Sequence, residues 1–342
     1  MLVLNIFLQG PWKNEGSQIS DPLMQDLFEK LPGVVLKDKA DSTTTKYAQG
    51  FQRWAIWAKA RDQPVPVMPA SPLHVALYLL SLMQTSDTPS PITTAFYSIA
   101  WAHRVSSLTP PTDHPLPKSV LEAAKRTLVK THKGKEPLSL ETIQKLCQRF
   151  PLESSSLFDI RTLTIIVLGF AGFLRFNEIS NLKCSDILIY DTHTAIFVEK
   201  SKTDKYREGS WVLISRTNNS TCPVRILEKY LDMCAFQQDA NQFVFCSLSK
   251  TKSGYIVRKD GKPISYSRLR ELFISAIKEV VPNVEAFGLH SLRSGGATQA
   301  ARSGIPDRLI KKHGRWASET AKDLYIREAL QDKLRLSLSL GL

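Results

Sequence analysis

The sequence has few cysteines, and their placement excludes the disulfide-stabilised and zinc-binding classes of small protein. The chain has five, an odd number, and no two of them form a C-x-x-C pair. The seven histidines show neither an H-x-x-x-H pair nor a Cys/His spacing typical of zinc ligands. We therefore expect reduced thiols, serving as small core residues, and no metal site. The cysteines are Cys147, Cys184, Cys222, Cys234 and Cys246.

Long hydrophobic runs are also missing. The N-terminal stretch MLVLNIFLQG is too short to cross a membrane, and it lacks the basic start and small-residue cleavage site of a signal peptide. No other stretch approaches a transmembrane length. We expect an ordinary soluble protein with no membrane partner.

Acidic residues are too few to balance the basic ones. The chain has 32 Asp and Glu against 45 Lys and Arg, a formal net charge of +13. This excess favours a polyanionic partner such as nucleic acid or an acidic membrane surface, with a merely soluble basic surface as the alternative. At 342 residues and 43% hydrophobic residues, the chain can bury a full core, and its length allows one domain or two.

Residues 23–131 have helical periodicity and almost no strand-like alternation. One helix is expected to have Asp41, Ser42 or Thr43 as its N-cap, and the next to have Ser71 as N-cap with Pro72 in its first position. This second helix, SPLHVALYLLSLMQ, is apolar nearly all round and is expected to be buried. PITTAFYSIAWAHRV and PKSVLEAAKRTLVKTHK complete a predicted bundle of about four helices.

A charged segment without apolar periodicity, residues 132–138, is predicted to be a flexible linker to a second domain, residues 139–342. There, RTLTIIVLGFAGFLRFNEISNL predicts one long apolar helix. The short runs DILIYD, TAIFVEK and SWVLIS predict a three-stranded antiparallel sheet, and SETAKDLYIREALQDKLRLSL predicts a final helix. The expected fold is mainly α with a small antiparallel β-sheet: an N-terminal helical domain and a C-terminal α+β domain.

The stretch GLHSLRSGGATQAARSG places His290 and Arg293 at the start of a predicted helix. A helix start directs backbone N–H groups and a positive dipole end toward an anion. Small residues in the next turn, Gly295, Gly296 and Ala297, permit close packing behind the charged residues. The pattern is typical of a phosphate site, although H-x-x-R also arises where His caps the helix and Arg pairs with a surface carboxylate.

A second arginine follows the predicted apolar helix. Arg175 comes directly after the almost wholly apolar part of this segment and Glu178 comes one turn later, so that a cation and a carboxylate are held at the edge of a core. An ordinary i, i+3 ion pair is the alternative interpretation. Between the second and third predicted strands, EKSKTDKYREG is a lysine-rich hairpin, a kind of segment that is usually only solvated.

Trp316 precedes Tyr325 by nine residues in HGRWASETAKDLYIRE. Taken alone, both are ordinary packing residues. Taken in order, however, R-x-x-E, a hairpin lysine, H-x-x-R, and a Trp and Tyr nine residues apart resemble the catalytic domain of the tyrosine recombinases, the family of phage integrases and Xer- and Cre-type enzymes. The resemblance covers roughly residues 137–335. The earlier helical segment resembles the family's core-binding domain in length and character.

The resemblance assigns a role to each matching position. It implies that Tyr325 is the nucleophile, that Arg175 and Arg293 clamp the scissile phosphate, and that His290 shares the phosphate contacts and proton handling. Glu178 matches the acidic residue that supports the first arginine.

Two positions need a choice. The match of SKTD to the family's hairpin implies that Lys202 is the general acid, with Lys200 and Lys205 as alternatives. Trp316 falls where most members have histidine and some have tryptophan, so it would contribute packing and an indole N–H; His313 lies three residues too early for that place. The implied reaction is DNA strand exchange through a 3′-phosphotyrosyl link and a Holliday junction, without metal, ATP or cofactor.

The implied partner is double-stranded DNA, held between the two domains by lysine and arginine. Strand exchange implies a homo-tetramer assembled on DNA. The leucine-rich C-terminal tail EALQDKLRLSLSLGL is expected to dock on a neighbouring subunit or to pack onto its own domain.

Three other functions stay open from the sequence alone. The chain could be a catalytically silent DNA-binding protein derived from a recombinase, a type IB topoisomerase-like nicking-closing enzyme, or a basic helical interaction module in which Tyr325 is structural. KCSDI, KSKTDKYREG and CPV resemble the recombinases of eukaryotic mobile elements, the Crypton-type transposons and tyrosine-recombinase retrotransposons. This resemblance predicts a nuclear location, and a cytoplasmic, nucleoid location otherwise.

Overall fold

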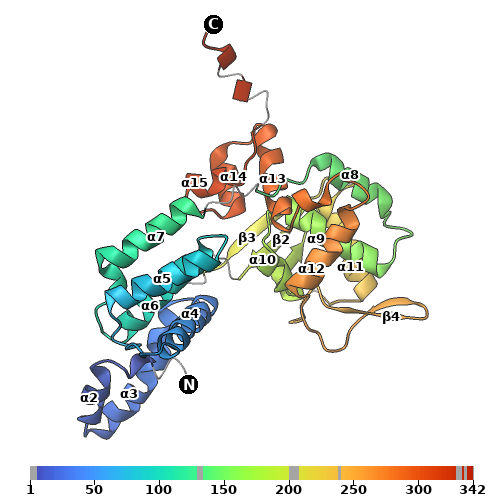
Figure 1. Cartoon of the computed structure of the whole chain (residues 1–342). Coiled ribbons are helices and arrows are strands. Elements are labelled where there is room, and N and C mark those ends of the chain that lie inside the picture. Colours follow the sequence, from blue (N-terminus) through green and yellow to red (C-terminus); the bar gives the residue numbers. More distant parts are fainter. Residues whose placement is uncertain are drawn as a thin grey trace. The chain divides into compact units, whose positions relative to one another are not determined.

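The computed structural model describes residues 6–128, 134–199, 208–237, 240–328, 333–334 and 337–341. The chain forms two compact units, Met1–His132 and Lys133–Leu342 (Figure 1). The division falls within the segment predicted to be a linker. None of the described helices is both long enough and apolar enough to cross a membrane.

Helices and 3-10 turns are the regular elements found in the described residues of the first unit. Its core surrounds the fully buried Trp54, Ile92 and Ile99. Helices α4 and α6 pack closely because Gly50 leaves room for the Ser98 side chain; a Cβ at Gly50 would lie 2.1 Å from the Ser98 Oγ. The helices are α2 (Trp12–Ser17), α3 (Pro22–Val35), α4 (Asp41–Lys59), α5 (Pro72–Thr85), α6 (Ser90–Val105) and α7 (Pro115–Thr127), with 3-10 turns at Leu36–Asp38 and Pro111–Asp113.

The predicted number of helices and the predicted N-cap of α4 need correction. Helices α2 and α3 add to the predicted bundle of about four. Helix α4 begins at Asp41 with Ala40 as its N-cap, so none of the three proposed caps is used; the helix starts one residue early because Asp41 itself has helical geometry. Helix α5 does begin with Ser71 and Pro72, as predicted.

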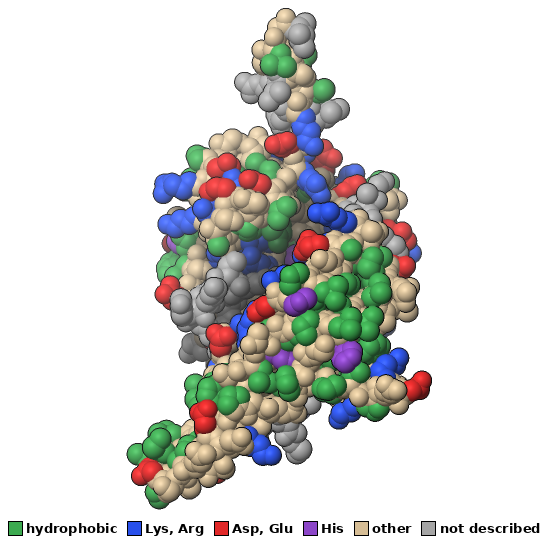
Figure 2. All heavy atoms as spheres, turned by 60° about the vertical axis from the view of Figure 1, so that its left-hand side comes forward, with side chains coloured by type: hydrophobic (Ala, Val, Ile, Leu, Met, Phe, Trp, Pro, Cys, Tyr) green, Lys and Arg blue, Asp and Glu red, His purple; other side chains and the backbone are tan. Residues whose placement is uncertain are grey.

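Helix α5 is also less buried than its composition predicts. Leu73, Leu77 and Leu80 follow helical spacing and are 54%, 47% and 43% exposed. The helix therefore buries one face on its own unit and leaves an apolar face open. Figure 2 shows hydrophobic side chains gathered on the face of this unit that is turned toward the viewer.

The second unit is built around α9. Almost every residue of this helix is buried, from Leu157 to Gly169, and it packs against both α11 and α13. A capping box fixes its start, because Ser156 and Asp159 each bond the other's backbone N–H. The helices are α8 (Leu140–Arg149), α9 (Leu157–Ala171), α10 (Phe176–Ser180), α11 (Pro223–Cys234), α12 (Tyr266–Ile277), α13 (His290–Arg302), α14 (Asp307–Gly314) and α15 (Glu319–Asp323). The remaining 3-10 turns are Cys184–Asp186 and Val284–Ala286.

The three predicted strands form one antiparallel sheet in the order β1-β2-β3. They are β1 (Ile187–Ile189), β2 (His193–Val198) and β3 (Ser210–Ser215), with Ile196 opposite both Ile187 and Val212. A second hairpin, β4 (Leu248–Thr251) with β5 (Gly254–Val257), was not predicted. The mainly α fold with small antiparallel sheets agrees with the sequence prediction. The five cysteines are free thiols, and four of them are buried, as expected.

The end of the predicted linker differs from the expectation. Glu136 and Leu138 donate backbone hydrogen bonds to the carbonyls of Ala286 and Ser291. Leu138 is 1% exposed and belongs to the core of the second unit. This short segment is therefore anchored to the second unit. The buried Leu138 side chain and the two backbone hydrogen bonds stabilise it there, although the sequence around it has no apolar periodicity.

Candidate active site

The long apolar helix predicted from residues 161–182 is broken, and the break positions Arg175. Helix α9 ends at Ala171, and Phe173 has a positive φ of 48°. Arg175 is then the N-cap residue of the short helix α10, on which Glu178 lies in the first turn. The prediction of one continuous helix is wrong because a run of apolar residues carries no signal for a left-handed phenylalanine.

The carboxylate of Glu178 binds two arginines. Its Oε1 accepts from the Arg175 guanidinium at 2.8 Å, and its Oε2 accepts from the Arg315 guanidinium at 2.7 Å and from the Arg175 backbone N–H at 2.9 Å. The Glu178 side chain is 2% exposed. Burial alone would raise the pKa of Glu178, but Arg315, the backbone N–H of Arg175 and the Arg175 guanidinium together hold it below its ordinary value.

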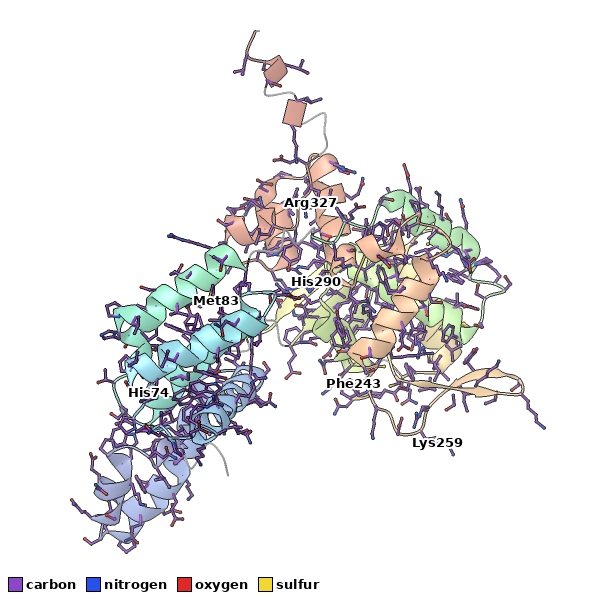
Figure 3. All side chains as sticks on the ribbon, in the orientation of Figure 1. His74, Met83, Phe243, Lys259, His290 and Arg327 are labelled. Carbon is purple, nitrogen blue, oxygen red and sulfur yellow. The ribbon has the colours of Figure 1, made fainter. Side chains whose placement is uncertain are left out.

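Helix α13 begins at His290, as predicted, and carries Arg293 into the interior. His290 is exposed at the helix start (Figure 3), whereas Arg293, one turn later, is 1% exposed. The Arg293 guanidinium donates to the carbonyls of Phe173 and Gly314. The small residues behind it are required: a Cβ at Gly295 would lie 2.2 Å from the Leu138 carbonyl oxygen.

Aromatic rings cover the other side of Arg293. Its guanidinium carbon lies 4.2 Å from the centroid of the Trp316 ring and 5.1 Å from that of Tyr325, and the two ring centroids are 5.3 Å apart. Trp316 is 5% exposed and Tyr325 is half-buried. Two groups of contacts therefore meet at the Phe173 carbonyl, which accepts from both Arg315 and Arg293. Arg315 belongs to the group with Glu178 and Arg175, and Arg293 to the group with Trp316 and Tyr325.

The charge of this group is not balanced. Three guanidiniums, those of Arg175, Arg293 and Arg315, surround one carboxylate, Glu178; we call these four residues the guanidinium cluster. Burial, followed by repulsion from Arg175, lowers the pKa of Arg293 to about 9. Arg293 stays protonated at neutral pH, so the lowered pKa reflects buried positive charge in need of an anion.

Two buried N–H donors are further evidence for an anion-binding site. Within the described part of the chain, the Arg293 Nε and the Trp316 Nε1 have no hydrogen-bond partner. A buried N–H without an acceptor is rare in folded proteins, and a catalytic role or a bound ion or water is among its explanations. Phosphate oxygens suit both the positive charge and the two donors. The described residues contain no group of three or more His, Cys, Asp or Glu side chains that could hold a metal ion.

Tyr325 lies just beyond a helix rather than within one. Helix α15 ends at Asp323 and Leu324 is its C-cap, so the predicted long final helix is wrong in this region. The Tyr325 backbone N–H donates to the Lys322 carbonyl at 2.8 Å, and its carbonyl accepts from the Thr298 hydroxyl at 3.3 Å. The tyrosine is therefore fixed to α13 through its backbone while its ring stays against Arg293.

Helix α15 is itself fixed by a buried lysine. The Lys322 side chain is 2% exposed and forms ion pairs with Asp307 at 2.8 Å, Glu319 at 3.0 Å and Asp323 at 3.3 Å. Asp307 belongs to α14, so the pairs tie α14 and α15 together. Sequence reasoning missed this lysine, because a lysine in a charged helical segment usually faces solvent.

The hairpin lysines lie outside the described residues. Lys200, Lys202 and Lys205 all fall within residues 200–207, between β2 and β3. The choice of Lys202 as general acid therefore stays a prediction. His313, in contrast, is explained: its Nε2 donates to the Ala171 carbonyl at 2.8 Å and its ring packs edge-on to Phe173. Burial lowers the pKa of His313, consistent with a neutral packing role.

Arg315 is the residue of the cluster that sequence reasoning missed. It stands directly before Trp316, and a lone arginine after a helix has no feature that separates it from a surface residue. Its signal is structural: φ is 56°, in the left-handed region, and its side chain is only 8% exposed.

Comparison with known proteins agrees with this geometry. Residues 136–331 match the model of the phage integrase family. The chain is 26% identical over 295 residues to an integrase/recombinase XerD homolog from Selenomonas ruminantium, covering 85% of this chain and 83% of the relative. It is 24% identical over 292 residues to the Cre recombinase of Escherichia phage P1, covering 80% of each.

Solved structures show the same fold. A XerH site-specific recombinase bound to its palindromic difH substrate superimposes with a TM-score of 0.56 at 15% identity, over 88% of this chain and 77% of that one. A lambda integrase dimer bound to a core site gives 0.53 at 17% identity, over 90% and 95%. Because the family model spans more than half of the sequence, the chain belongs to the phage integrase family and is a tyrosine recombinase.

Proposed function

We propose that the protein is a site-specific recombinase of double-stranded DNA in which Tyr325 forms a 3′-phosphotyrosyl intermediate. The phenol oxygen attacks the scissile phosphorus, a tyrosyl O–P bond forms, and the bond from phosphorus to the 5′-oxygen breaks. The departing oxygen takes a proton and becomes a 5′-hydroxyl. Because the tyrosyl ester retains the energy of the broken bond, the 5′-hydroxyl of another strand can reverse the step.

One observation carries this proposal: buried, uncompensated positive charge and two unpaired donors lie against the ring of a half-buried tyrosine. In the transition state the non-bridging phosphate oxygens gain negative charge, which preorganised guanidiniums stabilise strongly. Arg175 and Arg293 would bind those oxygens, and the Trp316 indole would donate to one of them. Glu178 keeps Arg175 in place.

Two groups would handle protons and contacts at the edge of the site. His290 is exposed at the start of α13, where the helix N-terminus favours an anion. It would share the phosphate contacts, and Lys202 would protonate the leaving 5′-oxygen, because an ammonium group is a suitable general acid for an alkoxide.

The formal charge of +13 supports a DNA duplex as partner. A homo-tetramer on DNA is supported by the described part of the C-terminal tail, where Leu334, Leu338 and Leu340 are 46%, 79% and 64% exposed. These leucines would bury apolar area on a neighbouring subunit. A mobile-element origin and a nuclear location stay predictions.

Trapping the intermediate tests the proposal. The purified protein is incubated with nicked suicide duplexes, from which the short 5′-hydroxyl strand diffuses away, and adducts are separated on a denaturing gel. The duplexes are drawn from the DNA that flanks the gene. We expect a covalent protein–DNA band with the wild type and none with Tyr325→Phe, while both bind the duplex equally in a mobility-shift assay. Equal binding with no adduct from the wild type would contradict the proposed chemistry.

A further inference from the structure

Arg315 adopts a backbone conformation that an arginine disfavours. It follows the last residue of α14 with φ 56° and ψ 41°, the left-handed geometry in which glycine ordinarily ends a helix. Its Cβ makes this geometry sterically unfavourable, whereas glycine would adopt it freely. A non-glycine residue in this left-handed conformation suggests the hypothesis that its side chain has a specific structural or functional role.

The contacts of the Arg315 side chain show the consequence of this backbone conformation. The left-handed turn directs the guanidinium back into the unit, where one nitrogen donates to the Glu178 Oε2 at 2.7 Å and to the Phe173 carbonyl at 3.3 Å. The other terminal nitrogen lies 3.3 Å from the His313 carbonyl. The side chain is 8% exposed and both terminal nitrogens bind acceptors within the protein, so Arg315 acts on the reaction through its neighbours.

Two of those neighbours lead directly to the phosphate-binding arginines. Glu178, held by Arg315 on one oxygen, holds Arg175 with the other. The Phe173 carbonyl, which accepts from Arg315, also accepts from Arg293. Arg315 therefore shares one partner with each of the two arginines, Glu178 with Arg175 and the Phe173 carbonyl with Arg293.

We propose that Arg315 is a positioning residue for DNA cleavage, which keeps Glu178 ionised and fixed so that Arg175 and Arg293 meet the scissile phosphate in one geometry. The inference rests on the proposed function, since it concerns the same phosphate site. Its physical basis is that ionising a buried carboxylate costs free energy unless a cation lies next to it. Arg175 cannot fill that place by itself, because it must also bind the phosphate. Arg315 is the dedicated counter-ion that leaves Arg175 available.

Arg315→Gly is a suitable test because glycine prefers the left-handed conformation, so the variant relieves backbone strain while removing the guanidinium. Cleavage of the suicide duplex is followed under single-turnover conditions, with protein in excess, between pH 5.5 and pH 8.5. Arg308→Ala is the matched control, because it removes one exposed positive charge from the neighbouring helix α14. Arg315→Lys tests rescue by a cation of a different shape.

We expect Arg315→Gly to bind the duplex within about threefold of the wild type and to cleave it roughly tenfold to a hundredfold more slowly, the usual loss when an active-site group is mispositioned. Its rate should rise with pH across the neutral range, because without Arg315 burial raises the pKa of Glu178, which then takes up a proton at lower pH. The wild type and Arg308→Ala should lack that dependence, and Arg315→Lys should recover part of the rate.

Two outcomes would overturn the inference by itself. In one, Arg315→Gly cleaves like the wild type. In the other, it cleaves slowly, with the wild-type pH profile and no rescue by lysine, which would mean that Arg315 only supports the fold. A wild type that forms no adduct on any duplex would instead overturn the proposed function, and this inference with it.

Discussion

The guanidinium of Arg293 and the indole of Trp316 form a buried cation–π pair, with the guanidinium carbon 4.2 Å from the ring centroid. Two carbonyls bind the same guanidinium, so Arg293 is fixed on its edge by hydrogen bonds and on its face by the ring. Each member of the pair also has one buried donor, the Arg293 Nε and the Trp316 Nε1, without a hydrogen-bond partner among the described residues. The pair thus combines a rigid position with two donors available to one anion, which is the preorganisation that phosphoryl transfer needs.

Trp316→Phe should separate the two contributions of the indole. Phenylalanine keeps an aromatic face for Arg293 but has no N–H, so we expect duplex binding to change little and the single-turnover cleavage rate to fall about tenfold to a hundredfold. Trp316→His restores an N–H donor and should recover part of the rate. Wild-type cleavage by Trp316→Phe would show that the indole N–H does not contact the phosphate.

His103 should make the first unit sensitive to acid. Its Nε2 accepts the Ala70 backbone N–H at 3.0 Å, so Nδ1 carries the proton and donates to the Ile99 carbonyl at 2.8 Å. Burial lowers the pKa of His103 below its ordinary 6.5, against the opposing effect of the hydrogen bond to Ile99. The stabilisation is therefore fully present above pH 6.5 and is lost as the pH falls from there through the lowered folded pKa.

The measurement is the urea midpoint of the full chain at steps from pH 8 to pH 5, for the wild type and His103→Gln. The variant should be less stable at pH 8 but should lose less stability on acidification, because glutamine does not titrate. His313, whose pKa burial also lowers, is present in both proteins and cancels in the comparison. Parallel curves for the two proteins would rule out His103 as the source of the acid sensitivity.

The helices and strands that can be predicted from the sequence are those marked by a local pattern of residues. Helix α13 starts at His290 and continues through a run of small, helix-compatible residues, as predicted, and the three strands of the first sheet follow from their alternation. The spacing of Arg175 and Glu178 likewise predicts their ion pair, which the structure contains.

The remaining features depend on contacts distant in the sequence. The break after α9 occurs at Phe173, a residue with no preference for positive φ, and its carbonyl is bound there by Arg293 and Arg315 from the other end of the unit. Arg315 is recognisable only once Glu178 lies beside it. No propensity scale contains such information, because tertiary contacts override local preference at these positions.

Gly296→Ala should show how closely α13 must approach α9. A Cβ at Gly296 would lie 2.1 Å from the Phe170 carbonyl oxygen and 2.6 Å from the Phe173 ring, and a carbonyl on a buried helix cannot move aside as a side-chain tip can. We expect the variant to lose about 1–3 kcal/mol of unfolding free energy.

The same substitution should slow cleavage, because moving α13 away from α9 separates Arg293 from the Phe173 carbonyl and from Arg175. Gly33→Ala is the matched control. Gly33 lies in α3, and a Cβ there would have no atom within 4 Å. Alanine should therefore raise stability by about 0.5–1 kcal/mol through its better helix propensity and leave cleavage unchanged. If Gly296→Ala behaved like Gly33→Ala in urea unfolding and in cleavage, the close packing of α13 on α9 would not be what positions Arg293.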